Sequence, residues 1–212
     1  MNVGRKAQDW EQCMSDAFRR LFDRILYRTD INLRRQAFTI LNIGCGNGRE
    51  TMDMRAACLI REIDCRIYAV DCDEDAIEVA KKSYTNSDTV FIADNAADPT
   101  MYTRFPDRAD VVILRQPEVT TYSPTDGDFF LQKYERILKL ALAKARKDGK
   151  LVVTTYNAIE YQIMLKILSS IPTIAMVQAE ANPYRDQSLE RENIKAKVID
   201  CPDQYVIVAT IN

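Results

Sequence analysis

The sequence predicts an α/β protein with a doubly wound, mostly parallel sheet and helices on both faces. Short apolar segments with the composition of strands alternate with amphipathic helical segments along the chain. A cluster of glycines stands at the first strand-to-helix turn, and no internal repeat or low-complexity linker interrupts the alternation. The predicted strand segments are 39–43, 66–70, 90–96, 109–114, 150–155, 173–179 and 204–211.

The first predicted element is a helix from Ala7 to Tyr27. Its apolar stripe consists of Trp10, Met14, Ala17, Leu21 and Ile25, with Phe18 and Phe22 beside it. Aromatic residues at helical spacing are more typical of core packing than of a ligand box. Acidic residues balance most of the positive charge of the arginines in this region. This favours a solvent-exposed helix face over a nucleic-acid-binding surface. We take 1–38 as an N-terminal helical extension and 39–212 as the main domain.

The second feature is the glycine cluster, in which Gly44, Gly46 and Gly48 make up three of the chain's six glycines. They lie between the strand Thr39–Ile43 and a helix that begins at Arg49, so we expect free backbone N–H groups beside a positive helix end. A tight turn of purely structural importance is the alternative. A dinucleotide fingerprint would require its last glycine at Arg49. The expected inward face of the helix is Met52, Ala56, Leu59 and Ile60.

Asp71 follows the predicted strand 66–70, and in a right-handed strand–helix–strand unit it lies at the same edge as the glycine loop. A carboxylate there can accept two hydrogen bonds from a ribose diol. The alternative is a surface turn carboxylate. We expect Asp73 or a neighbour to cap the next helix, with Ile77 and Ala80 on its inward face.

Five segments together resemble the class I S-adenosylmethionine-dependent methyltransferases. These segments are residues 40–50, 68–71, 76–80, 90–96 and 109–114. The resemblance implies a seven-stranded sheet whose antiparallel last strand is inserted beside the fifth, and it makes 39–212 the methyltransferase domain. It also implies that the glycine loop approaches the methionine moiety, Asp71 holds the ribose hydroxyls and Asp94 contacts the adenine amine. The expected cofactor-binding residues are Asn42, Gly44, Cys45, Gly46, Gly48, Asp71, Cys72, Asp94, Asn95 and Arg115.

Asn42 departs from the family pattern, which usually has an acidic residue at this position. Asparagine keeps the hydrogen-bonding capacity but lacks the negative charge that faces the cofactor's ammonium group. We therefore keep a non-catalytic binding or regulatory protein with the methyltransferase fold as the alternative function.

The segment after the fourth strand, Arg115 to Pro124, is expected to help set the methyl acceptor. It lacks the Asn-Pro-Pro-Tyr type of motif that marks amino methylation of nucleobases. Glu118 and Tyr122 are the candidate catalytic groups, and a surface loop without chemistry is the alternative. The polar link 182–203 is expected to act as a lid or acceptor clamp that is mobile without acceptor, and a disordered surface excursion is the alternative. We expect the pocket to be completed by this link with Tyr184, by Tyr156 and by the first helix through Trp10 or Met14.

The remaining elements continue the alternation. A helix is predicted from Asp128 to Lys147, with a stop at Asp148-Gly149, and another from Ala158 to Ser170. The inward residues of the first of these helices are expected to be Ile137, Leu138, Ala141, Leu142 and Ala145.

Composition narrows the chemistry. The chain has no histidine, which excludes a Ser-His-Asp triad, a Cys-His pair and a His-based zinc site, and we expect no metal. The six cysteines are scattered without a Cys-x-x-Cys pair, which favours reduced thiols in a cytoplasmic protein. No apolar run reaches the length of a membrane span, residues 1–10 are too polar for a signal peptide, and the net charge is −2.

The sequence thus predicts an S-adenosylmethionine-dependent methyltransferase acting on a small molecule or a protein side chain. Methyl transfer needs no dedicated base, because the sulfonium donor is already activated and alignment supplies much of the rate. We expect neither a nucleic-acid nor a membrane partner. A nicotinamide-dependent oxidoreductase is disfavoured by Arg49 and by the absence of a hydride-transfer residue set. The acceptor and the oligomeric state stay open.

Overall fold

The structure of the protein is a computed structural model that describes residues 3–28, 38–84, 88–117, 127–184 and 203–212. Within these ranges the side chains of 3–14, 28, 127–130 and 176 are not described. The helices are α1 (Val3–Arg28), α2 (Arg49–Ile60), α3 (Glu74–Ser83), α4 (Gly127–Leu142) and α5 (Ala158–Ser169), with a 3₁₀ helix η1 (Pro99–Arg104). The strands are β1 (Phe38–Ile43), β2 (Cys65–Asp71), β3 (Thr89–Ala93), β4 (Ala109–Arg115), β5 (Ala145–Thr155), β6 (Ile174–Ala181) and β7 (Tyr205–Ile211).

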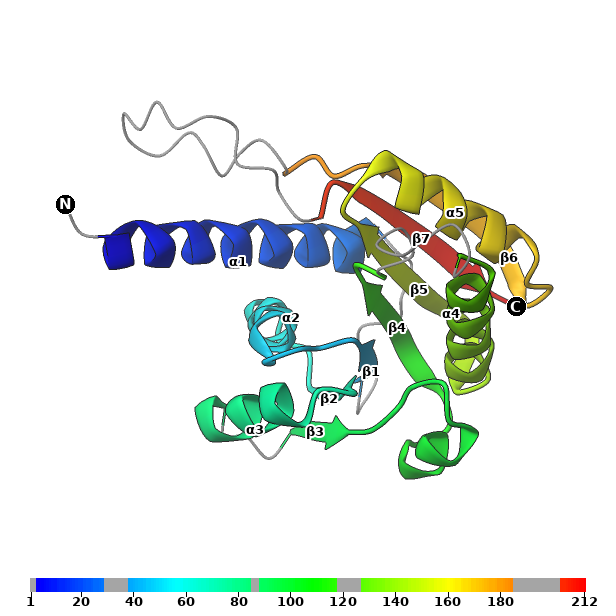
Figure 1. Cartoon of the computed structure of the whole chain (residues 1–212), viewed down its shortest axis with the longest axis horizontal. Coiled ribbons are helices and arrows are strands. Elements are labelled where there is room, and N and C mark those ends of the chain that lie inside the picture. Colours follow the sequence, from blue (N-terminus) through cyan, green and yellow to red (C-terminus); the bar gives the residue numbers. More distant parts are fainter. Residues whose placement is uncertain (1–2, 29–37, 85–87, 118–126, 185–202) are drawn as a thin grey trace.

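The described strands form one seven-stranded sheet in the order β3-β2-β1-β4-β5-β7-β6 (Figure 1). The first five strands of the chain pair in parallel, and β7 runs antiparallel to both β5 and β6. The predicted fold class is therefore confirmed, including an antiparallel last strand inserted beside β5. The strand order reverses between β1 and β4, which is where open α/β sheets bind ligands outside the carboxyl ends of their strands.

Helices cover both faces of the sheet (Figure 1). One face packs against α1, α2 and α3, and the other packs against η1, α4 and α5. The second half of α1 buries its large apolar side chains against β1, β4 and α2. These buried residues are Phe18, Leu21, Phe22, Ile25 and Leu26. Full burial of one such side chain contributes about 1.5–3 kcal/mol. This half of α1 therefore shares a core with the sheet, and a domain boundary at residue 38 stays a prediction.

The predicted inward face of α2 is wrong. Leu59 and Ile60 are 61% and 69% exposed, whereas Met54, Ala57 and Cys58 are buried with the polar Thr51 and Asp53. The cause is that α2 packs against α1 as well as the sheet, and the two inward polar side chains are hydrogen-bonded to Asn42 and Ser15. A hydrophobicity pattern alone does not detect an inward polar group that has a partner.

The predicted end of α4 is also wrong, because the helix ends at Leu142 and β5 already begins at Ala145. The Lys144 carbonyl accepts hydrogen bonds of 2.8 Å from the amides of Arg108 and Ala109, which draws the chain out of the helix and into the sheet. Asp148, with a φ of 63°, lies inside β5 instead of ending a helix. The turn residues Asp148 and Gly149 therefore mark an irregularity in the β4–β5 pairing, not a helix stop.

Other local predictions are confirmed. The Asp73 carboxylate caps α3 by accepting a hydrogen bond from the Ala76 amide, and Ile77 and Ala80 are buried. The predicted helix 158–170 corresponds to α5, and the closing strands β6 and β7 lie within two residues of their predicted bounds. Among the described residues, no helix is both long and apolar enough to cross a membrane.

Candidate cofactor site

The candidate site lies at the carboxyl edge of the sheet, where the glycine loop joins β1 to α2. Gly44, Gly46 and Gly48 have φ values of 74°, 49° and 81°, a region that only glycine adopts readily. A Cβ on Gly48 would lie 2.7 Å from the Phe91 ring, so this glycine allows close packing. A Cβ on Gly46 would meet nothing within 4 Å. The loop is therefore packed at Gly48 and open at Gly46.

Four amide groups of the loop are not free as expected. Gly44 and Cys45 donate to the Val70 carbonyl at 2.8 and 3.1 Å, and Gly48 donates to the Cys45 carbonyl at 2.9 Å. The Gly46 amide donates to Asp71 Oδ2 at 2.7 Å. The reason is that the end of β2 lies against the loop and supplies acceptors. These amides already have acceptors within the protein. A ligand at this edge would therefore contact the surface of the loop and the neighbouring carboxylates more readily than it would bond to these amides.

Asp71 connects β2 to the loop and keeps further acceptor capacity. Oδ2 accepts the Gly46 amide and Oδ1 accepts the Asp73 amide at 3.0 Å. A carboxylate has about four acceptor positions, so both oxygens can still accept hydroxyl hydrogen bonds. Asp71 is half-buried, whereas the neighbouring Cys72 is exposed. The loop-positioning contact of Asp71 is not evident from the sequence.

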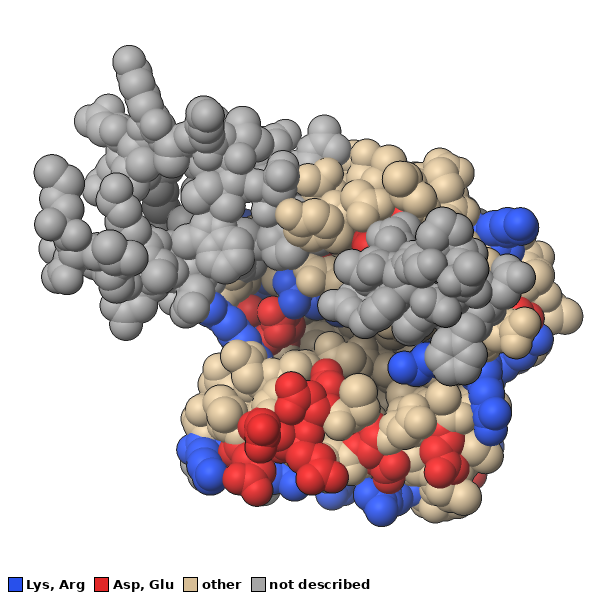
Figure 2. Space-filling view, viewed as in Figure 1, with Lys and Arg blue, Asp and Glu red and all other residues tan. Residues whose placement is uncertain are grey.

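Asp94 and Asn95 follow β3 at the same edge. The Asp94 amide donates to the Asp71 carbonyl at 2.9 Å, so the ends of β2 and β3 are joined. The Asp94 carboxylate accepts the Asn95 amide at 2.8 Å and pairs with Arg104 at 3.3 Å. Figure 2 shows acidic side chains gathered in the lower half of the view, over the ends of β2 and β3 and the start of α3. This edge of the molecule therefore carries a negative surface.

Asn42 and Cys45 are both buried. Asn42 is 2% exposed, and its Nδ2 donates to Thr51 Oγ1 at 3.0 Å. Its side chain is thus used to hold α2 against β1. Burial, with a smaller effect from the charge of Asp71, raises the pKa of the Cys45 thiol. That thiol stays protonated at neutral pH, as expected for a small filler and not for a nucleophile.

Arg115, at the end of β4, occupies the centre of a mostly buried ion-pair cluster. Its Nε and Nη2 donate to Asp203 at 3.0 and 2.8 Å, and its Nη1 donates to Glu50 at 2.5 Å. Its guanidinium carbon lies 5.2 Å from the centre of the Phe18 ring on α1. Arg115 is therefore at the predicted edge, but its guanidinium is already engaged by the protein. We call Glu50, Arg115 and Asp203 the Arg115 cluster.

The segments that flank the cluster are fixed by hydrogen bonds at their ends. Gln116, with a φ of 47°, donates its amide to the Thr154 carbonyl at 2.8 Å and its Nε2 to Asp203 at 3.2 Å. Asn182 donates Nδ2 to the Asp203 carbonyl at 2.8 Å. The two ends of the link 182–203 are thereby joined beside β5. Neither Glu50 nor Asp203 was predicted, because a single acidic residue with a distant partner gives no local sequence signal.

The predicted acceptor residues are only partly within the described structure. Tyr156 follows β5 and is 45% exposed, whereas Tyr184 packs against the core shared by α1 and the sheet. Glu118, Tyr122 and residues 185–202 lie outside the described residues, as do the side chains of Trp10 and Met14. Their roles stay predictions.

Asp53 lies on α2, one turn beyond Glu50, and contacts α1. Ser15 donates its hydroxyl to Asp53 Oδ1, while Oδ2 is buried without a partner among the described residues. Burial raises the pKa of Asp53 to about 6, and the hydrogen bond from Ser15 opposes that rise. This buried carboxylate therefore titrates in a mildly acidic range.

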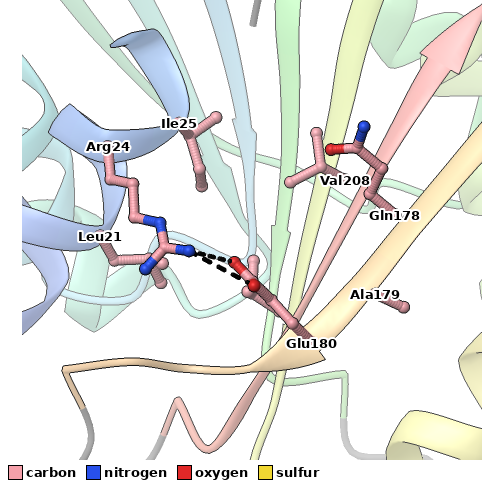
Figure 3. A pocket seen from close by; sticks show the side chains of 8 residues that line it. Leu21, Arg24, Ile25, Gln178, Ala179, Glu180 and Val208 are labelled. Atoms are coloured by element: carbon pink, nitrogen blue, oxygen red, sulfur yellow. Dashed lines mark hydrogen bonds and ion pairs between the residues drawn. The ribbon is translucent and has the colours of Figure 1, made fainter. Parts of the chain in front are cut away.

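A separate groove lies between α1 and the β7–β6 end of the sheet (Figure 3). It has a volume of about 240 Å³, with Leu21, Ile25 and Val208 among its apolar walls. Arg24 Nη2 bonds both carboxylate oxygens of Glu180 across it at 3.0 and 3.3 Å. The two charged side chains that line this groove, Arg24 and Glu180, are thus paired with each other.

In the part of the chain that the structure describes, no group of three or more His, Cys, Asp or Glu residues could hold a metal ion. The four cysteines described there, at positions 45, 58, 65 and 72, are free thiols.

Residues 40–140 match the protein family described as a methyltransferase domain. The resemblance to S-adenosylmethionine-dependent methyltransferases seen in the sequence is thereby confirmed, and the chain has their Rossmann-like fold. No curated protein sequence matches the chain.

Three solved structures illustrate the range of proteins that share the fold. An rRNA methylase from Streptococcus thermophilus is 11% identical to this chain, and the aligned region covers 92% of this chain and 94% of the methylase, with a TM-score of 0.56. The N-methyltransferase NodS from Bradyrhizobium japonicum is 14% identical, with 92% and 96% covered and a TM-score of 0.56. A plantazolicin methyltransferase, solved with SAH and a triazolic desmethyl analogue, is 13% identical, with 99% and 92% covered and a TM-score of 0.58.

Proposed function

We propose that this protein transfers a methyl group from S-adenosylmethionine to a small molecule or a protein side chain. The observation that carries the proposal is the open glycine loop beside Asp71 and Asp94, at the strand-order reversal of a chain that matches a methyltransferase domain. The plantazolicin methyltransferase of the same fold was solved with SAH. The alternative is a non-catalytic protein of this fold, and the uncharged Asn42 is the observation in its favour.

The residues at the edge fit the proposed cofactor. The space at Gly46 would admit a ligand against the loop, and the two oxygens of Asp71 have acceptor positions left for ribose hydroxyls. Asp94 would accept the adenine amine, and Cys72 and Asn95 are the other residues proposed to contact the cofactor. When bound, the cofactor supplies a methyl group on a sulfonium, an activated donor. The protein's own contribution is to bind, orient and shield the reacting groups.

The proposed acceptor site is inferred from which segments lie at the carboxyl edge of the sheet. Arg115 ends β4 and Tyr156 follows β5, so the segments after these strands, including Glu118 and Tyr122, are proposed to meet the acceptor. With no histidine in the chain, an amine, thiolate or carboxylate is the favoured acceptor, because such groups are already nucleophilic. The acidic surface over the ends of β2 and β3 would repel phosphates from that half of the edge, which supports a small-molecule or protein acceptor over a nucleic acid (Figure 2). We also propose a cytoplasmic location, in keeping with the free thiols.

Calorimetric titration with S-adenosylmethionine, with SAH and with NAD tests the cofactor. We expect the first two to bind and NAD not to bind. Asp71→Asn removes the charge but keeps the size of the side chain, so it should lose about 1.5–3 kcal/mol of binding free energy, on the order of 10- to 100-fold in affinity. Asp75→Asn, in the exposed first turn of α3, is the matched control and should bind normally. Unchanged affinity in Asp71→Asn would contradict the assignment.

Methyl transfer to a panel of amines, thiols, carboxylates, proteins and RNA tests the activity. Transfer to a small molecule or protein supports the proposal, and exclusive transfer to RNA contradicts its acceptor class. Tight cofactor binding without transfer to any of them would favour the non-catalytic alternative.

A further inference from the structure

Glu50 lies in the first turn of α2, directly after the glycine loop. Its side chain is 21% exposed, so it is partly buried but still reached by solvent. Oε1 accepts Arg115 Nη1, and Oε2 accepts no hydrogen bond from the residues that the structure describes. A partly buried carboxylate with one open oxygen thus stands beside the proposed cofactor edge. It also lies in the first turn of α2, where the amino end of a helix attracts negatively charged groups.

The two carboxylates of the Arg115 cluster are bound to the guanidinium in different ways. Asp203 is 2% exposed and takes Nε and Nη2 of Arg115 in a bidentate arrangement. Glu50 is 21% exposed and takes Nη1 alone. Of the two carboxylates, Glu50 is therefore the more exposed and the less fully bonded to Arg115. A partly buried carboxylate of this kind is stabilised by a further counter-charge.

The cluster lies next to the glycine loop. A Cβ on Gly44 would be 3.8 Å from the Arg115 carbonyl oxygen, so the first glycine faces the end of β4. Glu50 follows the last glycine of the same loop by two positions. Asn42, the other candidate on β1, is neutral, buried and bonded to Thr51. Among these residues, only Glu50 offers both a charge and an open oxygen.

We propose that Glu50 is the carboxylate that pairs with the ammonium group of the cofactor's amino-acid end, in place of a charged residue at Asn42. The inference rests on the proposed function. In this arrangement Asp203 neutralises Arg115, and Arg115 orients Glu50 through the Nη1 bond. Glu50 is then a specificity-determining residue that favours adenosyl ligands with an amino-acid end over those without one.

The test compares two ligands in calorimetric titrations. SAH carries the ammonium group, whereas 5′-methylthioadenosine has the adenosine and a thioether but no amino-acid end. Glu50→Gln is close to isosteric and can still accept from Arg115. We expect it to weaken SAH binding by about 10- to 100-fold and to leave 5′-methylthioadenosine within about twofold of the wild type. Glu74→Gln, in the exposed first turn of α3, is the matched control and should bind both ligands as the wild type does.

Each outcome separates the inference from the proposed function. A wild type that binds neither ligand overturns the proposed function, and the inference with it. A wild type that binds SAH, with a Glu50→Gln variant that loses nothing or loses both ligands equally, overturns the inference alone. Glu50→Asp keeps the charge and provides a second test, since it should retain most of the preference for SAH. Loss of that preference in Glu50→Asp with an unchanged Glu50→Gln would also overturn it.

Discussion

The two halves of the carboxyl edge are held together in different ways. At the ends of β2 and β3, the carboxylates of Asp71, Asp73 and Asp94 accept hydrogen bonds from backbone amides, mostly one to three residues away. At the ends of β4 and β5, the Arg115 cluster joins side chains that are 65 and 88 residues apart. The first half is built from local and largely exposed bonds, whereas the second depends on distant and buried charges. Single substitutions in the two halves should therefore have different effects on the free energy of unfolding and on ligand affinity.

The largest expected effect is in the second half. Asp203→Ala removes the bidentate partner of Arg115 and leaves Glu50 as the described carboxylate that still pairs with this mostly buried guanidinium. Breaking a buried ion pair from one side costs about 3–5 kcal/mol, measured as the free energy of unfolding in urea. Asp107→Ala breaks the exposed pair with Lys144 and is the control, with an expected cost of about 0–1 kcal/mol. Equal costs in the two variants would remove the distinction between buried and exposed pairs here.

The second prediction concerns the glycine loop in the first half. Gly48→Ala places a Cβ 2.7 Å from the Phe91 ring at a φ of 81°. The left-handed backbone costs about 1–2 kcal/mol and the forced repacking about 1–3 kcal/mol. Gly46→Ala has open space, so only the backbone cost applies to its stability. Thermal unfolding should rank Gly48→Ala below Gly46→Ala, while calorimetry should show weaker SAH binding for Gly46→Ala. The opposite ranking of unfolding temperatures would contradict the packing role of Gly48.

A third prediction concerns the contact between α1 and α2. Because burial raises the pKa of Asp53 from 3.8 to about 6, the folded protein binds a proton more tightly than the unfolded chain. The contribution of Asp53 to stability is therefore fully present below pH 3.8 and is lost as the pH rises to about 6, a fall of about 2–3 kcal/mol. Above that range the contribution of Asp53 is constant. Asp53→Asn should remove this slope from urea unfolding measured across the range. A slope unchanged by the substitution would assign the titration to another group.

These differences also explain what the sequence could predict. The glycine turn and the Asp73 cap were predicted because their residues follow one another within one strand–turn–helix unit. The position of Asp71 at the same edge followed from the strand–helix–strand topology, but its bond to Gly46, 25 residues away, was not predicted. The roles of Glu50 and Asp203 were not, because their common partner Arg115 is distant in the chain. The α4 end was missed for the same reason, since the Lys144 carbonyl bonds to amides more than thirty residues earlier. Local chemistry can be read from the sequence, whereas a contact between distant segments has to be seen in the fold.

The smallest expected effect lies at the far end of α2, away from both halves. Leu59 and Ile60 were predicted to face inward but are exposed, whereas Met54 is fully buried. Leu59→Gln should therefore change the free energy of unfolding by no more than about 0.5 kcal/mol, because it removes little buried area. Met54→Ala should cost about 2–5 kcal/mol, because it leaves a cavity between α2, α1 and the sheet. Urea unfolding of both variants measures the difference. A cost for Leu59→Gln comparable to that of Met54→Ala would mean that Leu59 is covered by a contact in solution, and the assignment of the inward face would have to be reversed.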